Sequence, residues 1–356
     1  MGRSPPGRFR KPEPMRILLT ADPELPVPPG PYGGIERLVD MWRRELRARG
    51  HTVALAARGD STAEVDRLFA WPGRRSQSAS DAVRNSLCLW SAARAFRADV
   101  VHSSSRLIYT LPLLLAGLPV VQTYHRFPGR RQVRIAALLG RRHLAFTGVS
   151  AFIAAIGRQG GGRWETVHNC VDIDRLTFCP QAAADAPLVF LSRIEEVKGA
   201  REAIAIATAA GRPLVLAGNH SADATAARYW REHIEPAIDG QRISYVGPVD
   251  DRQKDALLGR AAALLVPVQW DEPFGLVFAE ALACGTPVIS SPRGALPEIV
   301  REGENGFLVR TTGEGVAAVR AAAGLSRASC RRDAEARFSP RTAVDRFLGL
   351  YQDLQQ

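Results

Sequence analysis

The sequence predicts an α/β protein with two domains, each built around a parallel β-sheet. Three observations support this prediction. The chain has 356 residues, which is enough for two domains of ordinary size. Short apolar runs alternate with amphipathic helical patterns, as is typical of parallel strands joined by helices. This alternation begins near residue 15 and begins again near residue 187.

The first half opens with a strand–loop–helix–strand unit. Residues 15–20 predict a buried strand, apolar residues at helical spacing between Ile35 and Leu46 predict a helix, and residues 51–55 predict a second strand. The loop glycines do not fit the Gly-x-Gly-x-x-Gly dinucleotide fingerprint. Further strands are expected at residues 100–102, 120–124 and 145–149.

The second half repeats the same alternation. Residues 188–191 predict a buried strand, and a helix is expected to begin near Ala200. Further strands are expected at residues 214–218, 243–247, 263–267 and 287–290. The last helix, expected from Pro340 to Leu354, has an apolar face of Val344, Phe347, Leu348 and Tyr351.

The composition predicts a folded protein without a membrane-spanning segment. Hydrophobic residues make up 46% and charged residues 23%. The richest apolar run, residues 107–121, contains two prolines and is shorter than the roughly 18 residues that a membrane span requires. Five cysteines without a Cys-x-x-Cys pair favour a reducing cytoplasm. Residues 1–14 are expected to be a flexible tail rather than a signal peptide.

The net charge of +11 is concentrated in the first half. Residues 1–170 contain 26 Lys and Arg against 12 Asp and Glu, whereas residues 171–356 contain 21 against 24. Two groups of arginines stand out: Arg37, Arg43, Arg44, Arg47 and Arg49, and then Arg130, Arg131, Arg134, Arg141 and Arg142. A basic amphipathic surface would suit an anionic membrane or an acidic glycan. Compositional bias, with arginines solvating exposed faces, explains the same pattern.

The stretch from Glu272 to Glu280 combines two carboxylates with the start of a helix. Pro273 suits a first helical turn, and Phe274, Val277, Phe278 and Ala281 follow at helical spacing. We therefore expect Glu272 at the mouth of the helix and Glu280 about two turns inside it. The free amides of Gly275 and Leu276 would then point out of the amino end, where anions bind.

A second motif, Ser192-Arg193 followed by Lys198-Gly199, comes directly after a predicted strand. Ligands bind at strand ends in open α/β sheets, where Arg grips phosphate oxygens in pairs and Lys acts as a point charge. Asp172 and Asp174 match an Asp-x-Asp metal pattern. That match is short and lies on an expected interdomain loop, so no metal site is predicted.

These motifs resemble those of the retaining glycosyltransferases of family 4, which have the GT-B fold. The resemblance rests on Glu-x7-Glu with its Gly-Thr-Pro exit, on Ser-Arg-x4-Lys-Gly, on the Gly33-Gly34 step and on Asn169-Cys170-Val171-Asp172, where Cys170 replaces a glycine. It covers roughly residues 15–355 and implies two Rossmann-like domains facing a cleft. The implied parts are a tail at 1–14, an acceptor domain at 15–170, a nucleotide-sugar domain at 171–336, and a helix at 337–356 crossing back to the first domain.

The resemblance also implies roles for individual residues. Arg193 and Lys198 would stabilise the diphosphate, Glu272 would hold hydroxyls of the transferred sugar, and Glu280 would accept hydrogen bonds from the ribose. His125 would contact the donor sugar near the reacting carbon. The remaining expected donor-binding residues are Gly33, Gly34, Gly218, Asn219, Tyr245, Val246, Gly247, Phe274, Gly275 and Leu276.

The implied activity is retaining transfer of a hexose-type sugar from a nucleoside-diphosphate sugar to a hydroxyl group. UDP-sugar is favoured and GDP-sugar is next. The acceptor would be a glycan, a lipid-linked or a small molecule, and neither metal nor cofactor is expected. A sugar phosphorylase or sugar-phosphate synthase of the same fold is one alternative, and a non-catalytic polyanion binder is another. Aromatic residues beyond Trp42 are scarce in the basic clusters, so nucleic acid is not expected as a partner.

Overall fold

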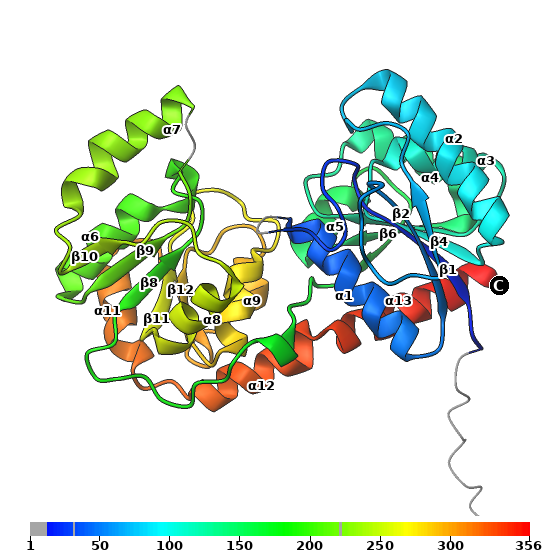
Figure 1. The fold of residues 1–356 in the computed structure, drawn as a ribbon. Coiled ribbons are helices and arrows are strands. Elements are labelled where there is room, and N and C mark those ends of the chain that lie inside the picture. Colours follow the sequence, from blue (N-terminus) through cyan, green and yellow to red (C-terminus); the bar gives the residue numbers. More distant parts are fainter. Residues whose placement is uncertain (1–12, 31–32, 221–222) are drawn as a thin grey trace, which may run out of the picture.

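The computed structural model describes residues 13–30, 33–220 and 223–356, which form two α/β domains lying side by side (Figure 1). Each domain is built on one parallel sheet, so the predicted fold class is confirmed. Most of the expected tail, residues 1–12, and residues 31–32 of the first loop lie outside the described residues.

The first domain contains a seven-stranded sheet in the order β3-β2-β1-β4-β5-β6-β7. The strands are β1 (Arg16–Thr20), β2 (Thr52–Ala57), β3 (Arg67–Ala70), β4 (Val100–Ser103), β5 (Val120–Tyr124), β6 (Leu144–Gly148) and β7 (Arg163–Thr166). All neighbouring strands run parallel. Their carboxyl ends therefore gather at one edge of the sheet.

Helices cover both faces of this sheet. They are α1 (Gly34–Ala48), α2 (Ala79–Phe96), α3 (Leu111–Leu115), α4 (Arg130–Gly140) and α5 (Ala151–Arg158). One buried cluster joins α1 and the last helix of the chain to the sheet, with Trp42 and Tyr351 among its members. A second cluster lies under α2, α3 and α4 and includes Leu89, Leu113 and Val133.

The second domain contains a six-stranded sheet in the order β10-β9-β8-β11-β12-β13. The strands are β8 (Leu188–Leu191), β9 (Leu214–Ala217), β10 (Ile243–Tyr245), β11 (Ala263–Val266), β12 (Val288–Ser290) and β13 (Gly306–Leu308). Its helices are α6 (Ala200–Ala210), α7 (Ala224–Tyr229), α8 (Asp251–Arg260), α9 (Leu276–Ala283), α10 (Leu296–Ile299), α11 (Thr312–Ala322) and α12 (Arg327–Phe338). The central strands β8 and β11 are fully buried, which is why they read as unbroken apolar runs.

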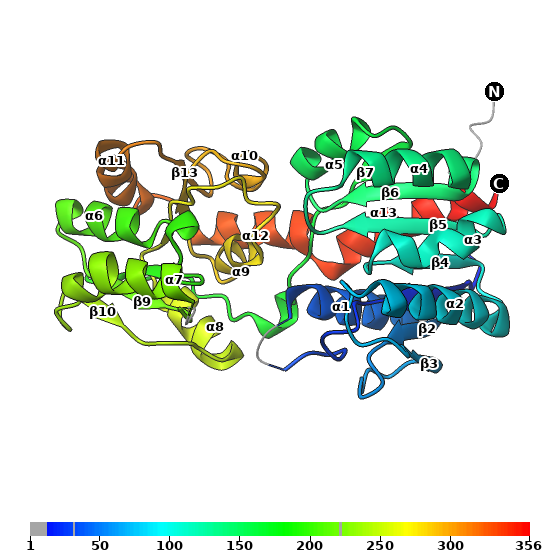
Figure 2. The same cartoon turned by 90° about the horizontal axis from the view of Figure 1, so that it is seen from above.

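The last helix, α13 (Pro340–Gln355), continues from α12 toward the first domain (Figures 1 and 2). Phe347 and Tyr351 lie in the core formed with α1. The hydroxyl of Tyr351 is 2.6 Å from Nδ1 of the buried His102 on β4. The end of the chain is thus part of the first domain's core.

Two further contacts join the domains near their junction. The carboxylate of Glu298, on α10, accepts hydrogen bonds from the backbone N–H groups of Ala151 and Phe152 at 2.6 and 2.7 Å. It also lies 3.0 Å from Nε2 of His168. Because the acceptor sits at the amino end of α5, its negative charge complements the helix dipole.

Candidate active site

A buried ion pair lies at the carboxyl edge of the second sheet. Nζ of Lys198 is 2.6 Å from Oε2 of Glu272, and both residues are 8% exposed. The indole N–H of Trp270 donates to the same carboxylate oxygen at 2.9 Å, and Nζ lies 4.6 Å from the centre of the indole ring. Lys198 and Glu272 line a cavity of about 210 Å³ together with Gly275 and Leu276.

The helix that follows Glu272 begins later than the sequence predicted. α9 starts at Leu276, and Gly275 precedes it with φ of 81°, a conformation that favours glycine. The expectation that Pro273 opens the helix was wrong, because the left-handed turn at Gly275 comes first. Glu280 therefore lies in the second turn of the helix rather than two turns inside it.

The amino end of α9 still borders the cavity beside Glu272. The first amides of a helix have no partner within it, so those of Leu276 and Val277 are available to an anion. Phe274 contributes only backbone here, because its side chain is 2% exposed and packs against His168 and Phe338.

The second glutamate of the motif also forms an ion pair. Oε1 of Glu280 is 2.5 Å from Nζ of Lys254 on α8. Lys254 also lies 3.4 Å from Asp251, which pairs with Arg37 of α1 at 2.6 Å. These four residues line a larger cavity, about 770 Å³, between the domains. A chain of charges thus connects the expected ribose site to the first domain.

Lys254 and Trp270 were not predicted as site residues from the sequence. One signal could have identified Lys254, because the whole chain contains only three lysines, Lys11, Lys198 and Lys254, among 47 basic residues. Two of these three pair with the two glutamates of the motif. Where nearly every basic position is arginine, a retained lysine marks a place that suits a compact ammonium group.

The ends of three neighbouring strands form the rest of this edge. The N–H of Gly218 donates to the carbonyl of Gly247 at 2.9 Å, and the hydroxyl of Tyr245 donates to the carbonyl of Gly218 at 2.8 Å. A Cβ on Gly218 would lie 1.9 Å from the carbonyl oxygen of Ser192, so only glycine fits. The carbonyl of Asn219 accepts from the N–H of Ile194.

Two side chains at this edge point toward solvent. Val246 is 50% exposed. The side chain of Arg193 is 45% exposed and pairs with Glu195 at 2.7 Å. Arg193 is therefore close in sequence to Lys198 but is not part of the buried pair.

Comparison with known proteins gives two family matches. Residues 182–331 match the family Glycosyl transferases group 1, and residues 32–175 match Glycosyltransferase Family 4. A glycogen synthase of Mycobacterium tuberculosis is 27% identical over 352 residues, spanning 82% of this chain and 81% of that protein. The structure of AviGT4, a glycosyltransferase involved in avilamycin A biosynthesis, is 26% identical with a TM-score of 0.71 and covers 96% of this chain and 98% of that one. Anabaena HepE in complex with UDP-glucose is 19% identical with a TM-score of 0.70, covering 94% and 98%.

The chain is a family 4 glycosyltransferase. The two family matches together run from residue 32 to residue 331, across both domains. Its paired parallel sheets are the GT-B fold of these relatives. The expected family, fold and enzyme class are confirmed.

In the glycosyltransferase, the second glycine of the first loop lies close to α9. A Cβ on Gly34 would lie 3.4 Å from Cδ1 of Leu276, whereas a Cβ on Gly33 would lie 2.6 Å from Cβ of Pro29 in its own loop. The start of α1 therefore meets the start of α9 across the two domains. This contact places the glycine step beside the cavity that contains Glu272.

His125 follows β5 in the first domain. Its ring stacks on Trp42 with centroids 6.0 Å apart, and both ring nitrogens are shielded without a hydrogen-bond partner. Burial lowers the pKa of His125 to about 3, with the charge of Arg126 acting in the same direction. The imidazole is therefore neutral at neutral pH.

Asp172 and Asp174 do not form a metal site with other acids. Asp172 is paired with Arg44 at 2.6 Å and with Arg175 at 3.4 Å. Within residues 13–30, 33–220 and 223–356, no group of three or more His, Cys, Asp or Glu side chains is arranged to hold a metal ion.

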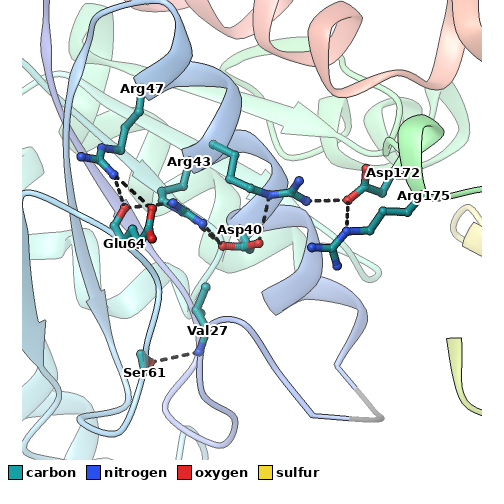
Figure 3. Close-up of polar contacts among 9 residues, drawn as sticks. Val27, Asp40, Arg43, Arg47, Ser61, Glu64, Asp172 and Arg175 are labelled. Atoms are coloured by element: carbon teal, nitrogen blue, oxygen red, sulfur yellow. Dashed lines mark hydrogen bonds and ion pairs between the residues drawn. The ribbon is translucent and has the colours of Figure 1, made fainter.

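The arginines of α1 are held by acids and carbonyl groups rather than exposed as a free basic surface (Figure 3). Arg43 pairs with Asp40 at 2.6 Å, and Arg47 donates to the carbonyl of Glu64 at 2.9 Å. Three more pairs complete the set: Arg37 with Asp251, Arg44 with Asp172, and Arg49 with Glu45 and Asp345. No helix among the described residues is long and apolar enough to cross a membrane.

Proposed function

We propose that this glycosyltransferase moves a hexose-type sugar, with retention and without a metal, from a nucleoside-diphosphate sugar to an acceptor hydroxyl. The acceptor is a glycan, a lipid-linked or a small molecule. The observation that carries the proposal is the buried pair of Lys198 and Glu272 beside the amino end of α9. A cation and free amides suit a leaving diphosphate, and the adjacent carboxylate suits sugar hydroxyls.

The negative charge that develops on the leaving diphosphate explains why Lys198 and Arg193 lie at this edge of the sheet. As the bond from the anomeric carbon to the diphosphate oxygen breaks, negative charge accumulates on the leaving group. Lys198, Arg193 and the first amides of α9 stabilise that charge in place of a metal ion. The acceptor oxygen forms its new bond on the same face, and its proton passes to a phosphate oxygen of the leaving group.

The nucleoside occupies the outer part of the same edge. Glu280 accepts hydrogen bonds from the ribose, for which its ion pair with Lys254 must open or rearrange. Backbone groups of residues 245–247 line the base. UDP is favoured because Anabaena HepE, which has the same fold, is in complex with UDP-glucose. GDP is the next choice.

We also propose that the enzyme contacts anionic membranes peripherally through α4. Ile135 and Leu138 on this helix are 59% and 70% exposed. Five arginines lie on or next to it, and within the described residues none of them pairs with an acid: Arg130, Arg131, Arg134, Arg141 and Arg142. Apolar and basic residues together on one helix suit an anionic lipid surface.

Pelleting with vesicles tests the membrane contact. The protein is expected to bind vesicles that contain phosphatidylglycerol and not pure phosphatidylcholine, and Leu138→Ser is expected to weaken binding severalfold. Val83→Ser, at an exposed position of α2, is the matched control. Binding that is absent at low salt would refute the contact.

A donor screen tests the transferase proposal. Hydrolysis or transfer is measured with a panel of UDP- and GDP-sugars, with magnesium and with a chelator, and the anomeric configuration of the product is read by NMR. Turnover of a UDP-sugar in the chelator with retained configuration is expected. Formation of a sugar phosphate from inorganic phosphate would instead support a phosphorylase. Failure of every nucleoside diphosphate to bind in a titration would refute the proposal.

A further inference from the structure

Two cysteines that are far apart in the chain are neighbours in the second domain. The backbone N–H of Cys179, in the segment that leads into β8, donates to the carbonyl of Cys284 at 3.1 Å. Cys284 caps the carboxyl end of α9. Paired residues of an antiparallel ladder, which exchange bonds of this kind, have Cα atoms about 5.5 Å apart, and a disulfide requires less than about 7 Å. The backbone therefore allows a disulfide between these two residues.

Both thiols lie against the same side of α8. Sγ of Cys284 is 3.5 Å from Oδ1 of Asp255, and a Cβ on Gly259 would lie 2.8 Å from Sγ of Cys179. Asp255 and Gly259 are four residues apart in the helix, so they share one of its faces. A glycine inside a helix costs stability, and here the missing side chain makes room for the Cys179 thiol. The two sulfur atoms thus lie beside one short stretch of a single helix.

A buried guanidinium group lies among these thiols. Arg327, at the start of α12, is 8% exposed and donates to backbone carbonyls and one hydroxyl, with the carbonyl of Cys179 at 2.7 Å among them. Within the described part of the chain it pairs with no carboxylate. Burial lowers the pKa of Arg327, and three nearby thiols, including that of Cys179, act in the opposite direction. Reactive cysteines in proteins lie beside such cations.

The thiols of this group differ in exposure. Cys179 is partly exposed, whereas Cys284 is fully buried. Burial raises the pKa of Cys284, and the charge of Asp255 acts in the same direction, so this thiol stays protonated. The third thiol, of Cys330, is also buried and lies 3.9 Å from the carbonyl oxygen of Asn305. A small oxidant in solution therefore reaches Cys179 first.

We propose that Cys179 is a peroxide-reactive thiol and that Cys284 resolves its oxidised form into a reversible disulfide. The oxidant is a hydroperoxide such as hydrogen peroxide. The Cys179 thiolate attacks one peroxide oxygen, the O–O bond breaks, and the released hydroxide takes up a proton to become water. The sulfur of Cys284 then attacks the resulting sulfenic acid, so that the S–S bond forms and the S–O bond breaks. The proton of the Cys284 thiol leaves with this hydroxide as a second water.

The disulfide changes the wall of the cavity between the domains. Asp255 lines this cavity together with Lys254 and Glu280, and the disulfide removes the thiol hydrogen that it accepts from Cys284. A carboxylate with fewer hydrogen bonds presents more negative charge to the cavity, which disfavours an anionic nucleotide. Oxidation therefore weakens the binding of UDP. This effect rests on the donor site proposed above, whereas formation of the disulfide does not.

Alkylation and peptide mapping test the reactive pair in the full chain. Iodoacetamide is expected to modify Cys179 about fivefold or more faster than Cys88, as for a thiol beside a cation. Cys88 is the matched control, because it is also partly exposed and burial alone acts on its thiol. After treatment with hydrogen peroxide, mass spectrometry is expected to find Cys179 linked to Cys284, and dithiothreitol should separate them.

Titration with UDP tests the effect on the cavity. The peroxide-treated wild type is expected to bind UDP severalfold more weakly than the reduced protein, roughly the value of one hydrogen bond, and dithiothreitol should restore the affinity. Cys179→Ser is expected to bind UDP equally before and after peroxide. Cys330→Ser, which removes the third thiol of the group, should keep the response of the wild type.

Three results would overturn the proposal. The first is a Cys179 that reacts no faster than Cys88. The second is a peroxide-treated chain in which Cys179 remains unlinked or is linked to Cys330. The third is a disulfide between Cys179 and Cys284 that leaves UDP affinity unchanged. Failure of the reduced wild type to bind UDP would instead refute the donor assignment, because the thiol measurements do not depend on it.

Discussion

The two domains differ in whether the charged groups that face the cleft have ion-pair partners. In the second domain each glutamate of the motif already has a lysine, at 2.6 Å for Glu272 and 2.5 Å for Glu280. In the first domain Asp22 has a shielded oxygen without a partner, and Arg106 and Arg126 have no paired acid among the described residues. The glutamates of the second domain are thus neutralised by lysines, whereas these groups of the first domain lack ion-pair or hydrogen-bond partners.

This difference has consequences for donor binding and for stability. A donor must exchange existing ion pairs for its own phosphate and hydroxyl groups, so the free energy of binding includes the loss of those pairs. In the first domain, by contrast, the shielded oxygen of Asp22 has no hydrogen-bond partner, and leaving such a group unpaired costs stability. Substitutions in the second domain should therefore change mainly turnover and donor affinity. Substitutions at the unpaired groups of the first domain should also change the free energy of unfolding.

The largest expected effect is at Lys198. Lys198→Ala removes the buried cation next to the leaving diphosphate and leaves Glu272 unpaired, so turnover is expected to fall about a hundredfold or more. Steady-state kinetics on the best donor measures this, and Glu272→Ala should act similarly. Thermal unfolding serves as the control for folding. Turnover close to wild type in either variant would remove the central role of this pair.

Asp22→Asn is expected to stabilise the protein. Because burial raises the pKa of Asp22 from 3.8 to about 6, the charged carboxylate destabilises the native state, and this cost appears as pH rises from about 4 to 6. The variant is therefore expected to be more stable at pH 8, on the order of 2 kcal/mol, and not at pH 3.5. Chemical unfolding at both pH values checks it. A less stable variant at pH 8 would contradict the unpaired character of this side.

Lys254→Ala is expected to act on donor affinity. In the wild type the donor ribose must displace the ion pair between Glu280 and Lys254, so the donor KM should fall about tenfold, roughly the value of one charged hydrogen bond, with little change in kcat. Asp251→Asn, which weakens the outer contact of Lys254 and the pair with Arg37, should change the donor KM less. An unchanged KM in Lys254→Ala would show that Glu280 does not depend on this pair.

The smallest effect is expected at the junction. Burial disfavours the charged form of Glu298, but hydrogen bonds from His168, Ala151 and Phe152 outweigh it and lower the pKa of the carboxyl. The stabilisation is present above the ordinary pKa near 4.5 and is lost as pH falls through the lowered value. Glu298→Gln should therefore cost about 1 kcal/mol at pH 7 and less at pH 3. Unfolding curves at both pH values test this, with the exposed Glu304→Gln as control.

Some buried strands could be predicted from the sequence because all of their residues are apolar. β8 and β11 are apolar throughout, since both faces of a parallel sheet are covered. The strands β3, β7 and β13 were not predicted; they lie at sheet edges and are only partly buried. Without a continuous apolar run, such strands resemble loops.

The site could be predicted only as a set of motifs. Glu272, Lys198 and Gly275 meet at one cavity as expected, because strand ends and a helix start converge there. The preference of proline for a first helical turn predicted that the helix begins at Pro273. The helix begins at Leu276 instead, after the left-handed turn at Gly275. The ion pairs of Arg44 and Arg49 join residues far apart in the chain, so only tertiary structure shows that these arginines are neutralised.

The scarcity of lysine has a practical consequence for spectroscopy and labelling. Apart from the chain terminus, the protein offers three primary amines, and two of them contact the two motif glutamates. Reductive methylation with a ¹³C reagent would thus introduce very few resonances, of which one reports on Glu272 and another on Glu280. Each step of donor occupancy could be followed through its own methyl signal.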